Sequence, residues 1–152
     1  MYHYTDSGLR NIWLANGYKS KRTPYGVAVA IEDVEGLHRV IGLCLAREKP
    51  KLTGREFRFL RKELGLSQAA FAEAVGNDAQ TVALWEKNKT RLPVWADRLV
   101  RKLYLEATGG NEKLRDLLER LKNQDEQQRE SKWIFEERPR KGWSTTTPRK
   151  AA

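Results

Sequence analysis

The chain has 152 residues and a net charge of +9, with 29 Lys and Arg against 20 Asp and Glu. This length suits one or two small domains, and no apolar run approaches the roughly 18 residues that a membrane span requires. The first residues lack the pattern of a signal peptide, so we expect a cytoplasmic protein. The single cysteine, Cys44, excludes an internal disulfide, and two histidines add too few ligands for a closed zinc site, so we expect no metal and no cofactor.

Residues 1–50 show the pattern of a small α+β domain in which one helix packs on a sheet. Asn16-Gly17 stands between two strand-like runs and predicts a hairpin, because both turn residues tolerate positive φ. The following VAVAIED places alternate apolar residues on one face of a strand: Val27, Val29 and Ile31.

A helix is expected after this strand, with Asp33 as its N-cap. Its apolar residues fall on one stripe: Leu37, Val40, Ile41, Cys44 and Leu45. Cys44 is therefore expected to face inward as a small hydrophobic residue. His38 lies at the edge of the stripe, and we expect a structural role for it rather than metal binding or catalysis.

Residues 51–108 are expected to form a wholly helical domain after a hinge at 48–54, where a proline disfavours helix. Thr53 begins the first helix, with Glu56 completing a capping box. The later helices begin at Ser67, at Asn77 or Asp78, and at Pro93.

The C-terminal part is expected to contain one helix and a tail. Residues 109–130 form the helix, in which four leucines make a short apolar stripe: Leu114, Leu117, Leu118 and Leu121. Residues 131–152 mix proline, glycine, basic residues and tryptophan, which predicts an extended basic tail that is poorly ordered alone.

The most informative stretch is Leu66 to Pro93, LSQAAFAEAVGNDAQTVALWEKNKTRLP. It predicts two short helices joined by a tight turn at Gly76. The expected core between them consists of Phe71, Ala72, Val75, Val82 and Trp85. The outer face of the second helix then carries Ala79, Gln80, Thr81 and Leu84. This is how a protein presents a helix to the major groove of DNA.

The chemistry of this outer face suits base reading. The amide of Gln80 can pair bidentately with an adenine edge, while Ala79, the Thr81 methyl and Leu84 can touch thymine methyl groups. For Leu84, the alternative is packing against a neighbouring loop.

Phosphate contacts are expected on both sides of the reading helix. Gln68, at the start of the preceding helix, can donate its amide. The loop after the reading helix is polar and basic: Lys87, Asn88, Lys89, Thr90 and Arg91. The net charge fits a polyanionic partner, because bound phosphates release counterions. A solvated charge is the alternative for any single lysine.

The run LSQAAFAEAVG, then AQTVALWEKNK and a proline, resembles the Cro/C1-type (Xre) helix-turn-helix family of phage repressors and bacterial regulators. The resemblance covers about residues 53–93. It implies that Gln68 binds phosphate and that three residues face bases: Ala79, Gln80 and Leu84. It also implies a structural salt bridge between Arg61 and Glu86. Asn88 stands where such proteins often have glycine, and asparagine also tolerates a left-handed cap.

A longer stretch, about residues 1–107, resembles one branch of that family, the MqsA/YgiT-like antitoxins. The matching runs are GLRNIWLANGY, TPYG, LHRVIGLCLAREKPKLTGREFRFLRKELGLSQ and VALWEK. The best-known members bind zinc through CxxC pairs in their N-terminal domain. This chain has Tyr2, Tyr4 and Ser7 in that region, so the zinc site does not carry over.

The expected fold is mainly α: a helix-turn-helix bundle, a small N-terminal α+β unit, and a C-terminal helix with an extended tail. The expected function is sequence-specific binding of double-stranded DNA by a transcriptional regulator, a homodimeric (auto)repressor on a palindromic operator. The dimer contact would use either the helix at 111–121 or four apolar residues after Pro93: Trp95, Leu99, Val100 and Leu103. The alternative is that these apolar stripes complete the core of each monomer.

The alternative function is that of an antitoxin in a type II toxin-antitoxin pair, which binds and neutralises a partner toxin and autoregulates its operon. The N-terminal sheet or the aromatic residues of the tail would bind the toxin: Trp133, Phe135 and Trp143. An enzyme is not expected, because His3 and His38 lack partners at catalytic spacing and no Gly-rich phosphate loop is present.

Overall fold

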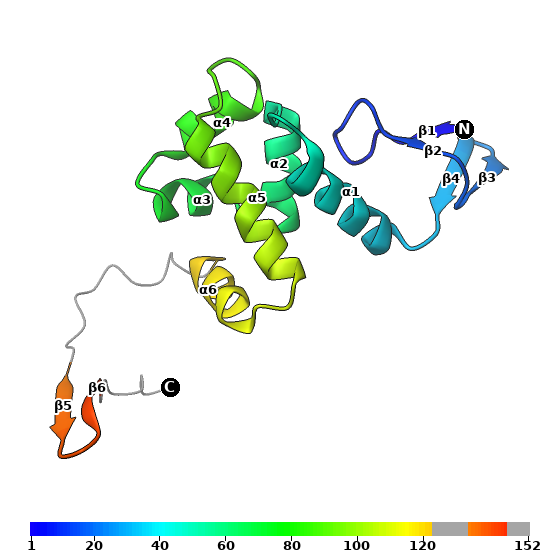
Figure 1. The fold of residues 1–152 in the computed structure, drawn as a ribbon. Coiled ribbons are helices and arrows are strands. Elements are labelled where there is room, and N and C mark those ends of the chain that lie inside the picture. The colour runs from blue at the N-terminus through cyan, green and yellow to red at the C-terminus, as the bar shows by residue number, and fades with distance from the viewer. Residues whose placement is uncertain (123–133, 146–152) are drawn as a thin grey trace.

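The computed structural model describes residues 1–122 and 134–145 of the chain (Figure 1). Its elements in chain order are β1 (Tyr2–His3), β2 (Trp13–Leu14), β3 (Tyr18–Thr23), β4 (Gly26–Ile31), α1 (Val34–Glu48), α2 (Gly54–Glu63), α3 (Gln68–Ala74), α4 (Ala79–Glu86), α5 (Val94–Thr108), α6 (Glu112–Lys122), β5 (Phe135–Arg138) and β6 (Gly142–Thr145). The fold is mainly α with small β-hairpins, as the sequence predicts. None of the helices in these ranges is both long and apolar enough to cross a membrane.

Helices α2 to α5 surround one apolar core. Its fully buried side chains include Phe57, Leu60, Phe71, Val82 and Val100. The ring of Phe57 meets the rings of Phe71 and Trp85 edge to face, at centroid distances of 5.2 and 6.0 Å. Trp85 and Ala72 are buried as expected, and Val75 is half-buried. This packing fixes α3 against α4.

The helices of this bundle begin where the capping residues predict. Thr53 and Glu56 form the reciprocal capping box of α2. Ser67 caps α3, and Asp78 rather than Asn77 caps α4. A hydrogen bond from the backbone N–H of Thr81 lowers the pKa of Asp78, so this cap is ionised at neutral pH. Local signals alone therefore place the ends of the helix-turn-helix.

The N-terminal strands pair differently from the prediction. β1 pairs with β2 and β3 pairs with β4, both antiparallel, so Asn16-Gly17 joins two strands that do not pair with each other. The hairpin closes instead between Thr23 and Gly26, and the Thr23 hydroxyl donates to the Gly26 carbonyl. The predicted hairpin at Asn16-Gly17 was wrong, because a positive φ such as the +77° of Gly17 also suits a bend between two sheets.

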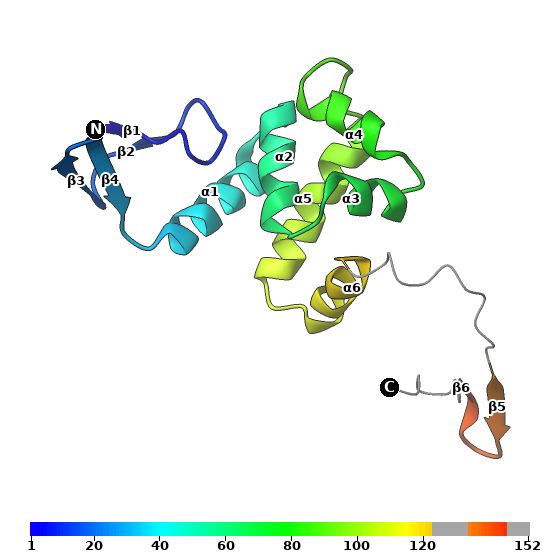
Figure 2. The same ribbon diagram turned by 180° about the vertical axis from the view of Figure 1, so that it is seen from behind.

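Helix α1 packs against α5 and α2 (Figures 1 and 2). Its buried residues are Ile41, Gly42, Leu45 and Ala46. A Cβ added to Gly42 would lie 2.3 Å from the ring of Tyr104, so this glycine permits the close approach of α1 to α5. The prediction that Cys44 faces inward was wrong: its thiol is exposed, because the buried stripe runs along Ile41 and Leu45.

A polar clasp joins the N-terminal segment to α1 and α2. The hydroxyl of Tyr4 lies 2.7 Å from His38 Nε2, and His38 Nδ1 lies 2.9 Å from Glu63 Oε1. Since the carboxylate can only accept, Nδ1–H donates to Glu63, and in a neutral imidazole this tautomer leaves Nε2 to accept from the tyrosine. Burial raises the pKa of Tyr4, which keeps the hydroxyl protonated, and only 3% of the residue is exposed. The Tyr4 hydroxyl is thus a structural donor and not a nucleophile.

At the C-terminal end, α6 packs against α5 and α3, with Leu118 buried and Leu117 46% exposed. Residues 135–145, expected within an extended tail, instead form the hairpin β5–β6. Its turn has a hydrogen bond from Lys141 N–H to the Arg138 carbonyl, with Arg140 at φ +69°. Residues 123–130 of the expected helix, and Trp133, lie outside the described residues.

We predict that Gly42→Ala destabilises the protein. Helix propensity alone would raise the free energy of unfolding by about 1 kcal/mol, but the clash with Tyr104 should reverse the sign and give a net loss of about 1–2 kcal/mol. Urea denaturation measures the change. Cys44→Ala, on the exposed side of the same helix, is the matched control and should change stability little. A stabilised Gly42→Ala variant would show that α1 is not held closely against α5.

Candidate nucleic-acid interface

The turn between α3 and α4 leaves one side of α4 uncovered. Ala72, 1% exposed, accepts the Asn77 N–H at 2.8 Å through its carbonyl, and Gly76 has a φ of +72°. On the inner side of α4, Val82 and Trp85 are buried. On its outer side Gln80 is exposed, whereas Ala79 and Thr81 are half-buried.

Leu84 lies one turn after Gln80 on the same side of α4, with 37% of its surface exposed. Its carbonyl accepts the N–H groups of Lys89 and Thr90, at 3.0 and 3.4 Å, so the loop after α4 folds back over the helix end. The side chain is nevertheless accessible beside the Gln80 amide. An exposed amide and an exposed apolar group on one short helix are suited to adenine and thymine edges.

One buried carboxylate at the end of α4 fixes the position of three helices. Arg61 donates to both oxygens of Glu86, from Nε at 2.6 Å and from Nη2 at 2.9 Å, and from Nη1 to the Leu66 carbonyl at 2.8 Å. Gln68 Nε2 donates to Glu86 Oε1 at 3.0 Å. The amide of Gln68 is therefore oriented by Glu86 and has a second N–H for a phosphate. Arg58 is 3.9 Å from the same carboxylate, with its side chain 56% exposed.

The loop after α4 is exposed at all five residues expected to bind phosphate: Lys87, Asn88, Lys89, Thr90 and Arg91. Lys87, Lys89 and Arg91 form no ion pair with a carboxylate in the described ranges. Asn88 has a φ of +56°, and its Oδ1 accepts the Gly54 N–H at 3.0 Å. Asn88 thus takes a left-handed conformation and also binds the start of α2.

A hollow of about 600 Å³ opens between this loop, the segment 50–52 and the start of α5. Its basic lining residues are Lys51, Lys89, Arg91, Arg98 and Arg101. Pro93 gives α5 no side-chain cap, so the helix start adds its own positive potential here. Two of these cations were not among the residues predicted to bind phosphate: Lys51 at the hinge and Arg98 one turn into α5. Nothing in a single sequence distinguishes them from solvated charges.

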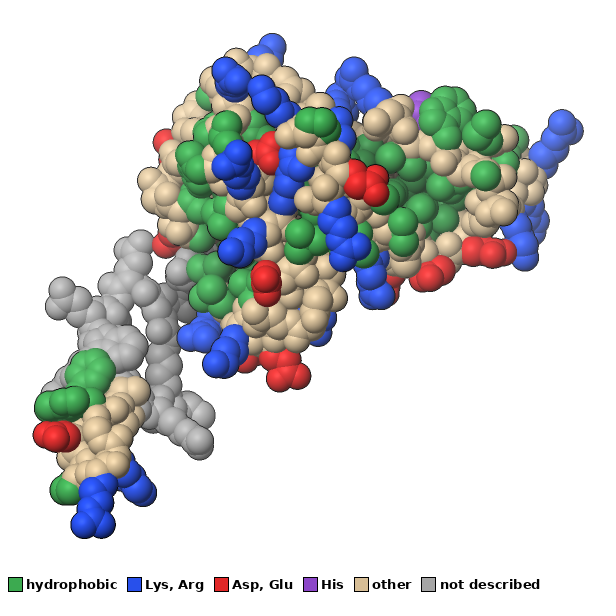
Figure 3. All heavy atoms as spheres, in the orientation of Figure 1, with side chains coloured by type: hydrophobic (Ala, Val, Ile, Leu, Met, Phe, Trp, Pro, Cys, Tyr) green, Lys and Arg blue, Asp and Glu red, His purple; other side chains and the backbone are tan. Residues whose placement is uncertain are grey.

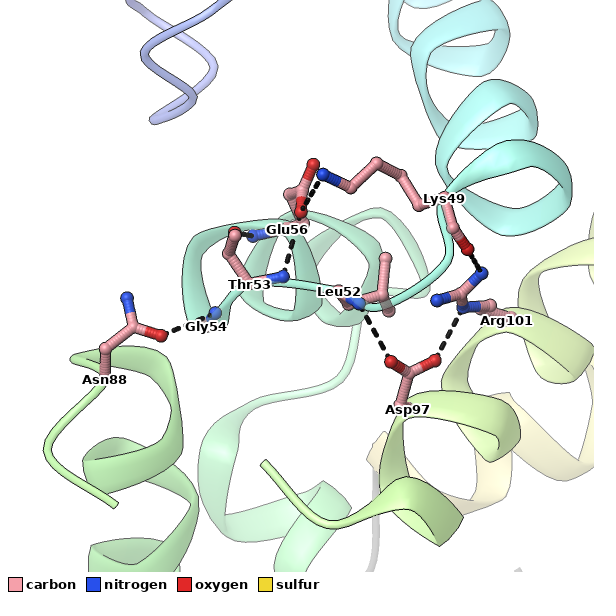
Figure 4. A network of polar contacts seen from close by, with 8 residues as sticks. All are labelled: Lys49, Leu52, Thr53, Gly54, Glu56, Asn88, Asp97 and Arg101. Carbon is pink, nitrogen blue, oxygen red and sulfur yellow. Dashed lines mark hydrogen bonds and ion pairs between the residues drawn. The ribbon is translucent and has the colours of Figure 1, made fainter. Parts of the chain in front are cut away.

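The hinge before α2 is fixed by the contacts drawn in Figure 4. Asp97 accepts the Leu52 N–H at 2.8 Å and lies 2.6 Å from Arg101 Nε, while Arg101 Nη1 donates to the Lys49 carbonyl. Lys49 in turn pairs with Glu56 at 3.4 Å. Asp97 therefore neutralises Arg101, and among the described residues the cations of the hollow without a carboxylate partner are Lys51, Lys89, Arg91 and Arg98.

Within the described ranges, no group of His, Cys, Asp and Glu residues could hold a metal ion. The arrangement offers exposed donors and positive charge around one uncovered helix. Such an arrangement is chemically suited to binding a polyanion and contacting base edges.

We predict graded effects of substituting Asn88. Asn88→Gly keeps the left-handed backbone accessible but removes the bond to Gly54, which should cost about 1 kcal/mol. Asn88→Ala also imposes the left-handed conformation on a residue that avoids it, and should cost about 2–3 kcal/mol in total. Chemical denaturation of both variants measures this order. A smaller loss for Ala than for Gly would contradict the assigned backbone role.

Comparison with known proteins gives one family match, which covers this part of the chain. The helix-turn-helix family model matches residues 57–94, from α2 to the first residue of α5. The searches of curated proteins and of solved structures gave no match. Residues 57–94 therefore match a helix-turn-helix model of the Cro/C1 type, and this match suggests a DNA-binding transcriptional regulator.

Proposed function

We propose that the protein is a sequence-specific regulator of transcription in which α4 reads the major groove of double-stranded DNA. The uncovered outer side of α4, with Gln80 exposed and Leu84 beside it, is the observation that carries this proposal. Gln80 pairs with an adenine. Three apolar groups lie against thymine methyl groups: Ala79, the Thr81 methyl and Leu84.

The groups that bind phosphate flank α4 on two sides. At the start of α3, Gln68 is held by Glu86 with one amide N–H to spare. After α4, the loop offers Lys87, Lys89 and Arg91, none of which has a carboxylate partner in the described ranges. Two such flanks position a helix in the groove between both strands, and α4 supplies the sequence preference.

The regulator acts as a homodimeric (auto)repressor on a palindromic operator, with half-sites about 34 Å apart. α4 has only 8 residues and few base contacts, which favours two copies on one site. Exposed apolar residues near the start of α5 and on α6 support a dimer contact there: Val94, Trp95 and Leu117. Val100 is 0% exposed, so it belongs to the core of the monomer instead.

We predict that Gln80→Ala and Lys89→Ala have different effects on DNA binding. Gln80→Ala should relax discrimination at one base pair by about 1–3 kcal/mol while random DNA binds as before. Lys89→Ala should weaken operator and random DNA by the same factor, because a phosphate contact carries no sequence information. Competition gel shifts with operator and mutated operators measure both.

Lys62→Ala is the matched control for charge, because Lys62 is exposed on α2 and has no ion pair in the described ranges. It should leave both kinds of DNA binding unchanged. Equal losses on operator and random DNA for Gln80→Ala would contradict the assignment of α4 as the reading helix.

A second function, that of an antitoxin, is favoured by the apolar surface of the N-terminal unit. Tyr25 is 99% exposed, Val27 65% and Trp13 57%, and Figure 3 shows hydrophobic side chains across this part of the molecule. Exposed apolar residues gathered on one unit are typical of protein interaction surfaces. A toxin encoded beside this protein is the partner we propose for this surface.

We predict that the double variant Tyr25→Ser with Val27→Thr abolishes binding to the adjacent gene product and leaves operator binding intact. Both side chains are exposed at the β3–β4 turn, so the fold should be unaffected. Copurification with the adjacent gene product and a gel shift on the operator separate the two activities. A wild-type protein that does not bind the adjacent gene product would leave the lone regulator as the function.

A further inference from the structure

We propose that the loop joining β1 to β2 is a second DNA-binding element, in which Arg10 contacts a phosphate beyond those bound by the loop 87–91. The inference rests on the proposed DNA-binding function and extends its surface onto the N-terminal unit. Neither the family model, which matches residues 57–94, nor the helix-turn-helix pattern includes Arg10.

The backbone of this loop is held firmly on α2. Leu9 is only 2% exposed and anchors the loop in the core. Arg55 Nη1 donates to the Gly8 carbonyl at 3.2 Å, and His3 Nε2 donates to the Arg10 carbonyl at 2.6 Å. The loop therefore already has a fixed shape, so a phosphate bound by Arg10 orders only one side chain.

The loop borders the residues that follow α4. A hollow of about 260 Å³ is lined by Arg10, Asn11 and Arg55 on one side and by Asn88 on the other. Asn88 also lines the larger basic hollow that contains Lys89 and Arg91. The two hollows thus meet at Asn88, and basic surface runs from the loop after α4 to the N-terminal unit.

The charges in this hollow favour an anion. Its one acidic lining residue is Glu56, which is 4% exposed, accepts the Thr53 N–H and pairs with Lys49. Arg10 and Arg55 have no carboxylate partner in the described ranges. A guanidinium binds phosphate oxygens in pairs, and the amide of Asn11 adds a neutral donor.

Duplex DNA is the polyanion that fits the continuity of this surface. In Figure 3 basic side chains stand along one edge of the molecule, over the loop after α4 and over the loop that joins β1 to β2. Figures 1 and 2 show both loops on that edge. A phosphate backbone bound at Lys89 and Arg91 can continue along this edge to Arg10. The predicted footprint is therefore longer on this side than the contacts of residues 68–91 alone would give.

The test measures binding of the full-length wild-type chain and of Arg10→Ala to the operator at salt concentrations of about 50–200 mM. Loss of one phosphate contact should make the negative slope of log K against log salt less steep by about 0.9. It should also weaken binding on the order of fivefold at physiological salt. The same factor should apply to random duplex, and ethylation interference should lose one phosphate signal at the edge of the footprint.

Arg22→Ala is the matched control, because Arg22 is exposed on β3 and has no ion pair in the described ranges. It should leave the slope unchanged. If Arg10→Ala behaves like Arg22→Ala, the inference fails while the proposed function stands. If Arg10→Ala instead weakens only the complex with the adjacent gene product, the loop contacts a protein, and the inference is overturned. A wild-type chain that binds no duplex would refute the proposed function itself.

Discussion

The buried pair between Arg61 and Glu86 is the interaction on which the DNA-binding surface depends. It joins the end of α4 to α2, and through Gln68 it also joins the start of α3. Removing either partner would leave an uncompensated buried charge, at a cost of about 3–5 kcal/mol. The same carboxylate orients the amide proposed to bind phosphate. The stability of the bundle and the orientation of the amide proposed to bind DNA therefore depend on the same carboxylate.

A second constraint comes from the close contact between the start of α2 and the end of α4. A Cβ on Gly54 would lie 2.2 Å from the Trp85 carbonyl, and the Gly54 N–H is bound by Asn88. Asp97 and Arg101 tie the hinge just before it to α5. The loop after α4, the hinge and the N-terminal unit thus meet at one junction. This explains how a unit outside the helix-turn-helix can contribute to the same surface.

Local chemistry explains what could be predicted from the sequence and what could not. Helix caps and apolar spacing depend on residues only a few positions apart. The caps at Thr53 and Ser67 and the apolar pattern of α3 and α4 therefore predicted the helices, their buried sides and the exposed side of α4. Strand pairing depends on residues distant in sequence, and the Asn16-Gly17 signal failed for that reason. The prediction for Cys44 failed because α1 carries apolar residues on two sides, and its packing against α5 and α2 decides which side is buried. Arg10 and Arg98 have no local signal at all, because their meaning arises from which loops lie side by side.

The N-terminal unit carries two surfaces of opposite character. Tyr25 and Val27 are exposed at the β3–β4 turn, whereas Arg10 lies in the loop held on α2 beside Asn88. A protein bound to Tyr25 and Val27 would therefore leave the basic edge accessible to DNA. On this arrangement the two proposed functions do not compete for one surface. If both proposals hold, the regulator and its protein partner can occupy the operator together.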